Sequence, residues 1–97
     1  MAQIVWSNPA IEDLQQLREF YTQFSNGYAD RLIDKLIERA DILISFPQSG
    51  RMAPQFNDGH TRELVSGDYS IIYRIPNANT VIISRIQHNA RPLTRLN

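Results

Sequence analysis

The chain has 97 residues, of which 42% are hydrophobic and 21% charged, and ten basic residues balance ten acidic ones. This composition is typical of one folded domain, and it argues against disorder and against a protein that coats nucleic acid through bulk charge. Because cysteine is absent, a disulfide framework and thiolate zinc ligands are excluded. No apolar run approaches the ~18 residues that cross a bilayer, and no secretory leader is visible, so we expect a cytoplasmic protein without membrane contact.

The net charge of zero is the sum of two unequal halves. Residues 1–49 carry four basic and seven acidic residues, a net charge of −3, whereas residues 50–97 carry six and three, a net charge of +3. Nine of the ten cations are arginine, whose planar fork suits phosphates and carboxylates. Such asymmetry indicates either an anionic partner for the basic half or a simple compositional preference for arginine.

The first half of the chain predicts a strand followed by a helical hairpin. Residues 3–7 are β-prone, and Asn8 with Pro9 favours a helix start, so we predict a strand in 1–7 and a helix over about residues 9–24. Ser25-Asn26-Gly27 predicts a break. A second amphipathic helix then ends before Pro47 and completes a hairpin over 8–46, with an apolar face that we expect to contain Tyr28, Leu32, Ile33, Leu36, Ile37, Ala40, Leu43 and Ile44.

Charged residues lie on both predicted helices, outside their apolar faces. Glu12 and Asp13 lie in the first turns of the first helix, where carboxylates complement the helix dipole. On the second helix, acidic and basic residues alternate, which predicts a solvated and mutually paired face composed of Asp30, Arg31, Asp34, Lys35, Glu38 and Arg39.

The second half predicts a loop, a meander of three strands and a tail. Turn-forming residues fill 47–60, and β-prone runs separated by short turns fill 61–88, which indicates antiparallel pairing. Residues 89–97 form the tail. The fold class is therefore α+β, with the helical hairpin packed on a small, mainly antiparallel sheet in the order β-α-α-β-β-β, and we expect one domain over residues 1–97.

The familiar motifs of catalysis and metal binding are missing from the sequence. It contains no glycine-rich phosphate loop, nucleophile elbow or H-E-x-x-H motif. His60 and His88 are the only imidazoles, and Asp58 with His60 lies in a segment rich in turn formers, so we expect no metal and no cofactor. Glu63 is expected on a strand surface.

Arginines on the predicted strands are the remaining candidates for a binding site. A period of two places Tyr69, Ile71 and Tyr73 toward the helices, and it groups Val81 and Ile83 with Arg85 on the opposite face from Ile82 and Ile86. If Ile82 and Ile86 face the core, Arg85 points outward. The residues expected to contact an acidic partner or phosphates on this open sheet surface or at its end are Arg62, Arg74, Arg85, His88 and Arg91.

For two other side chains the sequence predicts contacts within the protein. Arg51 follows a glycine in the loop and is expected to cap the second helix or to pair with Asp41. Trp6 is expected to pack on the sheet or the helical hairpin.

Short motifs over residues 4–92 together resemble the ParE branch of the RelE/ParE toxin superfamily. Each motif is short, and it is their order and spacing that carry the resemblance. They are Trp6, Asn8-Pro9-Ala10, Asp13-Leu14, Arg31-Leu32-Ile33, Phe46-Pro47, Gly50-Arg51, Arg62-Glu63-Leu64, Gly67-x-Tyr69, Ile72-Tyr73-Arg74 and Arg85-Ile86-x-His88-x-x-Arg91.

The resemblance implies a bacterial toxin of a type II toxin–antitoxin system with the fold described above, neutralised by a small antitoxin that wraps over it. Within the superfamily, ParE-like members poison DNA gyrase and RelE-like members cut messenger RNA on the ribosome. RelE-like nucleases resemble one another in a basic residue at the start of the middle sheet strand, where this chain has Ser70, whereas His88-x-x-Arg91 is similar to the ParE ending.

The resemblance therefore favours a non-enzymatic toxin that inhibits gyrase, without sequence-specific binding to nucleic acid. A ribosome-dependent endoribonuclease is the alternative, in which His88 and Arg85 or Arg91 would supply acid–base and cationic groups. A non-toxic binding module, whose arginines only hold a partner, is the third hypothesis.

Overall fold

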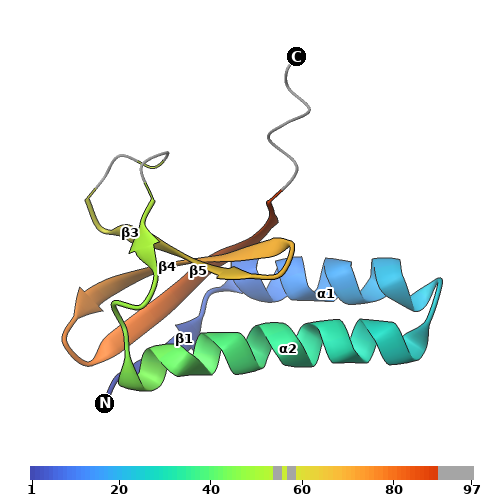
Figure 1. The fold of residues 1–97 in the computed structure, drawn as a ribbon, viewed down its shortest axis with the longest axis horizontal. Coiled ribbons are helices and arrows are strands. Elements are labelled where there is room, and N and C mark those ends of the chain that lie inside the picture. The colour runs from blue at the N-terminus through green and yellow to red at the C-terminus, as the bar shows by residue number, and fades with distance from the viewer. Residues whose placement is uncertain (54–55, 57–58, 90–97) are drawn as a thin grey trace.

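The computed structural model describes residues 1–53, 56 and 59–89. Two helices pack on one face of a five-stranded sheet whose strand order is β1-β5-β4-β3-β2, and all neighbours are antiparallel except β1 and β5 (Figure 1). This confirms the predicted α+β class and adds a two-residue strand in the segment predicted as loop. The elements are β1 (Gln3–Trp6), α1 (Asn8–Thr22), α2 (Asn26–Ser45), β2 (Arg51–Met52), β3 (Thr61–Ser66), β4 (Tyr69–Asn77) and β5 (Thr80–His88).

A serine caps the N-terminus of each helix. The Ser7 hydroxyl accepts a hydrogen bond from the backbone N–H of Ala10 at 3.2 Å, and the Ser25 hydroxyl accepts one from Tyr28 at 3.1 Å. Each cap satisfies one of the N–H groups that a helix start leaves unpaired. Asn8, predicted to cap a helix that starts at residue 9, is instead the first residue of α1, and Asn26 lies inside the first turn of α2 rather than in the break.

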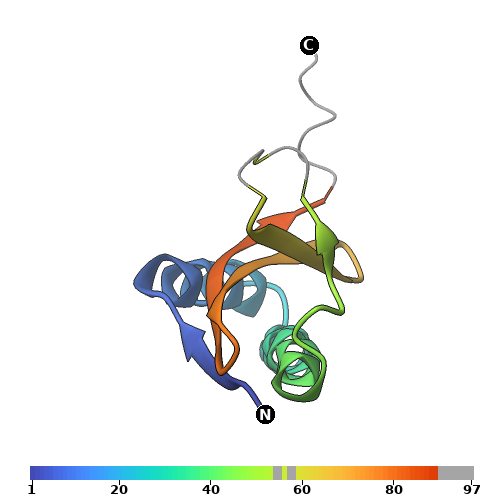
Figure 2. The ribbon, with the colours of Figure 1, turned by 90° about the vertical axis from the view of Figure 1, so that its left-hand side faces the viewer.

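The core lies between the hairpin and the sheet, as the end view shows (Figure 2). From α2 the buried side chains recur at spacings of three and four, so one stripe of the helix faces the sheet. Tyr28 and Ile37, which were expected on that face, are 46% and 38% exposed and lie at its margins. The buried cluster contains Ala2, Ala10, Leu36, Ala40, Leu43, Leu64, Tyr69, Ile71, Tyr73, Val81, Ile83 and Ile86, with Trp6 packed against it as expected.

A β-bulge in β5 changes which of its side chains face the helices. Ile72 of β4 pairs with Arg85, but the next residue, Tyr73, pairs with Ile83, so Ser84 is an extra residue in β5. The strict period of two predicted from the sequence is therefore wrong across this point. Val81, Ile83 and Ile86 all reach the core, and Ile82 shares the opposite face with Arg85.

Beyond the end of β1, groups at and just before the start of α1 form hydrogen bonds with the backbone of β5. The Ser7 N–H donates to the carbonyl of Ile83, and its hydroxyl donates to the carbonyl of Ser84, both at 3.0 Å. The carboxylate of Asp13, expected to serve the helix dipole, instead accepts the N–H of Ile86 at 2.9 Å. Polar groups of an open strand edge are thus satisfied by the adjoining helix rather than by another strand.

Tyr73 fixes the chain after α2 to the centre of the sheet. Its hydroxyl donates to the carbonyl of Pro47 at 2.7 Å and accepts the N–H of Gly50 at 2.8 Å. The backbone passes so close that a Cβ at Gly50 would lie 2.7 Å from both the Glu63 carbonyl oxygen and the Tyr73 ring. Glycine is required here by this close approach, and burial raises the pKa of the Tyr73 phenol, so the hydroxyl stays protonated.

Replacing Tyr73 with phenylalanine should destabilise the protein, because the buried Gly50 N–H loses its acceptor. We expect Tyr73→Phe to lower the free energy of unfolding by about 1–3 kcal/mol, measured by urea denaturation. Tyr28→Phe, which removes a hydroxyl from a half-exposed ring, is the control and should change it by less than about 0.5 kcal/mol. Equal unfolding midpoints for the two variants would contradict this role.

Replacing Asp13 with alanine should loosen α1 from β5, because the variant leaves the Ile86 N–H without an acceptor. We expect Asp13→Ala to cost about 1–3 kcal/mol in chemical denaturation and to accelerate amide exchange at Ile86. The neighbouring Glu12→Ala removes the same charge from an exposed position and should cost less than about 0.5 kcal/mol. Unchanged exchange at Ile86 in Asp13→Ala would refute the edge-capping role.

Candidate functional site

The strand arginines do not share one surface. Arg74 and Arg85 lie on the sheet face opposite the helices, because they pair in register with Ile82 and Ile72. Arg62 pairs with Tyr73, so it lies on the helix side at the sheet edge, and the expectation that it lines the same face is wrong. Its guanidinium donates to the carbonyl of Gly50 at 2.7 Å, which holds the loop after α2 in place.

A chain of polar side chains crosses the outer face of the sheet. Glu63, predicted on a strand surface, is only 8% exposed. Its carboxylate accepts two hydrogen bonds from Arg51, at 3.0 and 3.1 Å, and a third from the Ser70 hydroxyl at 2.7 Å. Ser70 also contacts the side chain of Asn89, directly after β5. Arg51 therefore pairs with Glu63 and not with Asp41, and Ser70 is fully buried within the network.

Arg85 is held by the residue that caps the edge of β5. Its Nε and one terminal nitrogen donate to the two carboxylate oxygens of Asp13 at 2.8 and 3.0 Å, a bidentate ion pair between α1 and β5. The Asp13 carboxylate raises the pKa of Arg85. The guanidinium is thus oriented toward α1, and its charge is paired within the protein.

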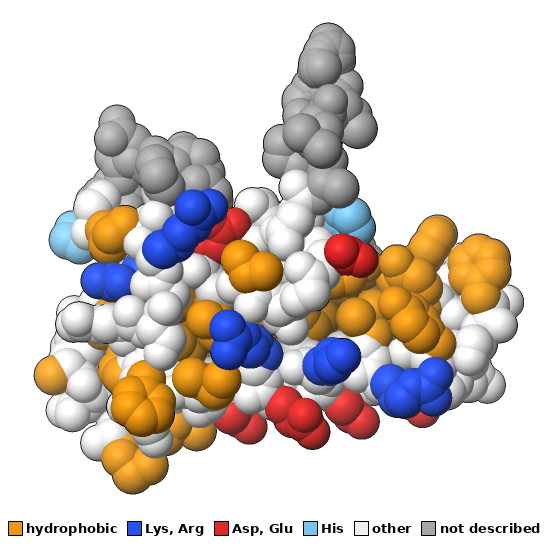
Figure 3. Space-filling view, viewed as in Figure 1, with side chains coloured by type: hydrophobic (Ala, Val, Ile, Leu, Met, Phe, Trp, Pro, Cys, Tyr) orange, Lys and Arg blue, Asp and Glu red, His pale blue; other side chains and the backbone are white. Residues whose placement is uncertain are grey.

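A groove of about 700 Å³ lies between α1 and the end of β5. We call it the α1–β5 groove. His88 and Tyr69 meet edge to face in its wall, with ring centroids 5.0 Å apart, and the Tyr69 hydroxyl bonds to that of Tyr21 at 3.0 Å. Burial and this bond raise the pKa of the Tyr69 phenol, so it remains neutral. Phe20, which is half exposed, also lines the groove. Figure 3 shows hydrophobic side chains gathered at the end of the hairpin.

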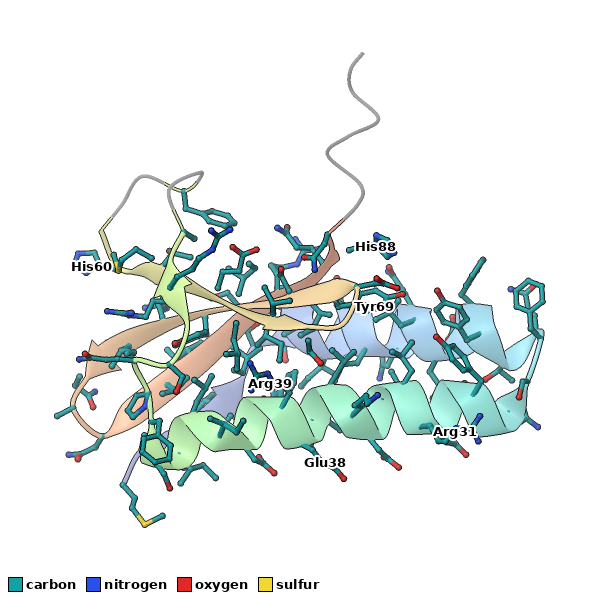
Figure 4. The ribbon with its side chains drawn as sticks, in the orientation of Figure 1. Arg31, Glu38, Arg39, His60, Tyr69 and His88 are labelled. Carbon is teal, nitrogen blue, oxygen red and sulfur yellow. The ribbon has the colours of Figure 1, made fainter. Side chains whose placement is uncertain are left out.

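Acidic and basic side chains form separate rows on α2 rather than the predicted paired face. Among the described residues, the ion pairs are Arg18–Asp30, Arg51–Glu63 and Arg85–Asp13, so none joins two residues of α2. Figure 3 shows the cations as a row beside the sheet and the acids as a row below it. In Figure 4, Arg39 points toward the sheet, where it donates to the Val65 carbonyl at 3.0 Å, and Glu38 points away. The basic row is Arg31, Lys35 and Arg39, and the acidic row is Asp34, Glu38 and Asp41.

Within the described part of the chain, three cations make neither a hydrogen bond nor an ion pair: Arg31, Lys35 and Arg74. Arg31 and Lys35 were not predicted as binding residues, because acidic neighbours on the same helix were expected to form ion pairs with them. Their spacing of four along a helix was the signal that they lie side by side. Arg91 lies outside the described residues.

The described residues contain no group of three His, Asp or Glu side chains placed to hold a metal ion, and Asp58 lies outside them. None of the described helices is long and apolar enough to cross a membrane.

Comparisons with known proteins agree with this architecture. Residues 4–93 match the family model described as the ParE toxin of the type II toxin–antitoxin system parDE. The chain is 39% identical over 92 residues to the protein named Toxin RelE2 of Caulobacter vibrioides, and the match covers 94% of this chain and 99% of that protein.

A solved structure described as the chromosomal ParDE toxin–antitoxin system from P. aeruginosa has the same fold. Its TM-score is 0.76 at 20% sequence identity, and the superposition covers 91% of this chain and 96% of that one. The family match spans nearly the whole sequence and includes the strands and helices that build the polar network, the α1–β5 groove and the basic row. The chain belongs to the ParE family of type II toxin–antitoxin toxins.

Proposed function

We propose that this ParE-family toxin inhibits DNA gyrase in the cytoplasm and that a cognate antitoxin neutralises it. The observation that favours gyrase over messenger RNA as the target is the burial of the Ser70 side chain. It stands where RelE-like nucleases resemble one another in a basic residue, and here the side chain is fully buried against Glu63 and Asn89. A serine held in this way offers no cation to a phosphate.

The surrounding groups also support a protein target over RNA cleavage. Cutting RNA through its 2′-hydroxyl requires a base, an acid and cations that stabilise the phosphorane. On the outer face, Arg51 and Arg85 are neutralised by carboxylates, and Glu63 brings a buried acid to its centre. His88 pairs with Tyr69 on the helix side, so it lies across the sheet from the network of Arg51, Glu63 and Ser70. Arg85 lines the α1–β5 groove together with His88, but its charge is paired with Asp13.

Arg74 is the sheet arginine best placed to contact the target. It is exposed on the outer face and makes no ion pair or hydrogen bond to the described residues. The α1–β5 groove is the proposed antitoxin site, because it joins apolar side chains such as Phe20 to polar side chains at the end of β5. The P. aeruginosa structure is described as a toxin–antitoxin system, which supports an antitoxin partner for this chain.

Purified toxin should block supercoiling of relaxed plasmid by gyrase and accumulate cleaved DNA–gyrase complexes. Adding the protein encoded beside the toxin gene should restore supercoiling. Arg74→Ala should weaken inhibition by about tenfold, the loss of one charge-assisted contact, whereas Arg18→Ala, which removes one charge from an exposed helix position, should not.

Normal supercoiling at a large excess of wild-type toxin would contradict a gyrase target. Codon-positioned cuts in translated messages, mapped by primer extension and abolished by His88→Ala, would instead identify the ribonuclease alternative. Induction without growth arrest, together with tight binding of the antitoxin, would identify a non-toxic binding module.

A further inference from the structure

Arg31 and Lys35, two of the three cations that make no hydrogen bond or ion pair within the described part of the chain, line a second groove. It has a volume of about 300 Å³ and lies between α2 and the turn that joins β3 to β4. We call it the α2–turn groove. Leu32 and Leu36 contribute to its apolar lining, and Tyr28, 46% exposed, stands beside the two cations. The groove therefore combines an apolar floor with a cationic margin.

Arg31 and Lys35 lie four residues apart on one helix, and like charges at this spacing repel each other by a few tenths of a kcal/mol. Asp34 and Glu38 lie three residues after them and offset this repulsion, but neither forms an ion pair with Arg31 or Lys35 among the described residues. The hydrogen-bond donors of both cations are therefore available to a carboxylate brought by a partner.

The opposite wall of the groove fixes how such a partner must be oriented. Gly67 and Asp68 of the turn form this wall, and the Asp68 carboxylate would repel acidic side chains placed against it. Acidic side chains of the partner are therefore favoured on the α2 side, next to Arg31 and Lys35. Its apolar side chains are favoured over Leu32 and Tyr28, as in the binding of an amphipathic segment to a hydrophobic groove.

We propose that the α2–turn groove binds an acidic amphipathic segment of the antitoxin, with its carboxylates on Arg31 and Lys35. This rests on the proposed function, in which an antitoxin occupies the α1–β5 groove. Tyr69 lines both grooves, so one chain can pass from the first groove around the end of the sheet into the second. Two linked contacts of this kind raise affinity because the second forms at a high effective concentration.

The test compares matched pairs of substitutions on the two rows of α2. Isothermal titration would measure binding of the protein encoded beside the toxin gene to wild-type toxin, to Arg31→Ala/Lys35→Ala and to Asp34→Ala/Glu38→Ala. The first double variant should bind about ten- to a hundredfold more weakly at low salt, with a smaller difference at high salt. The second, with the same spacing and truncation on the acidic row, should bind at least as tightly as wild type.

Thermal unfolding would verify that both double variants fold, as expected for alanine on exposed helix positions. Equal affinity of the two variants would overturn the proposal. So would a loss of gyrase inhibition in Arg31→Ala/Lys35→Ala with unchanged antitoxin binding, because the basic row would then serve the target. Absence of any binding by wild-type toxin would instead refute antitoxin neutralisation itself, and this site with it.

Discussion

The Asp13 carboxylate makes the contacts on which the arrangement of the α1–β5 groove depends. It accepts the N–H of Ile86 beyond the end of β1 and holds Arg85 in a bidentate ion pair. The first contact joins α1 to the sheet past the bulge at Ser84 and so shapes the α1–β5 groove. The second removes an arginine from the set available to a partner. One side chain thus links the fold to the distribution of free charge.

Pairing of charges within the protein also changes how the net charge of each half of the sequence is interpreted. By sequence, the helical half is acidic and the sheet half is basic. In the fold, however, Arg51, Arg62 and Arg85 of the sheet half are engaged within the protein, and of the three cations that make no hydrogen bond or ion pair among residues 1–53, 56 and 59–89, two lie on α2. Net charge by segment therefore does not predict which cations the fold leaves available to a partner. A charge is available to a partner only when the fold leaves it without an internal one.

Hydrophobic periodicity and turn residues predicted the element order and the helical hairpin on a sheet, because these depend on local patterns. The face of Arg62 and the partners of Arg51 and Glu63 could not be predicted, because they depend on strand register across sequence-distant residues. No glycine or proline in the sequence marks the bulge at Ser84. Because of this bulge, the β5 residues before it lie on the faces opposite to those that a period of two counted from Arg85 predicts. The separate charged rows of α2 were visible as spacing but were interpreted as ion pairs.

The most direct test of this account is a measurement of hydrogen exchange at the arginine Nε–H groups by NMR in the free toxin. Arg39, Arg51 and Arg85 each donate this hydrogen to an internal acceptor, so their signals should exchange slowly. The Nε–H signals of Arg31 and Arg74 should exchange rapidly, since both side chains are exposed. Rapid exchange at Arg85, or protection at Arg31 equal to that of Arg85, would contradict the claim that the fold reserves the α2 cations for a partner.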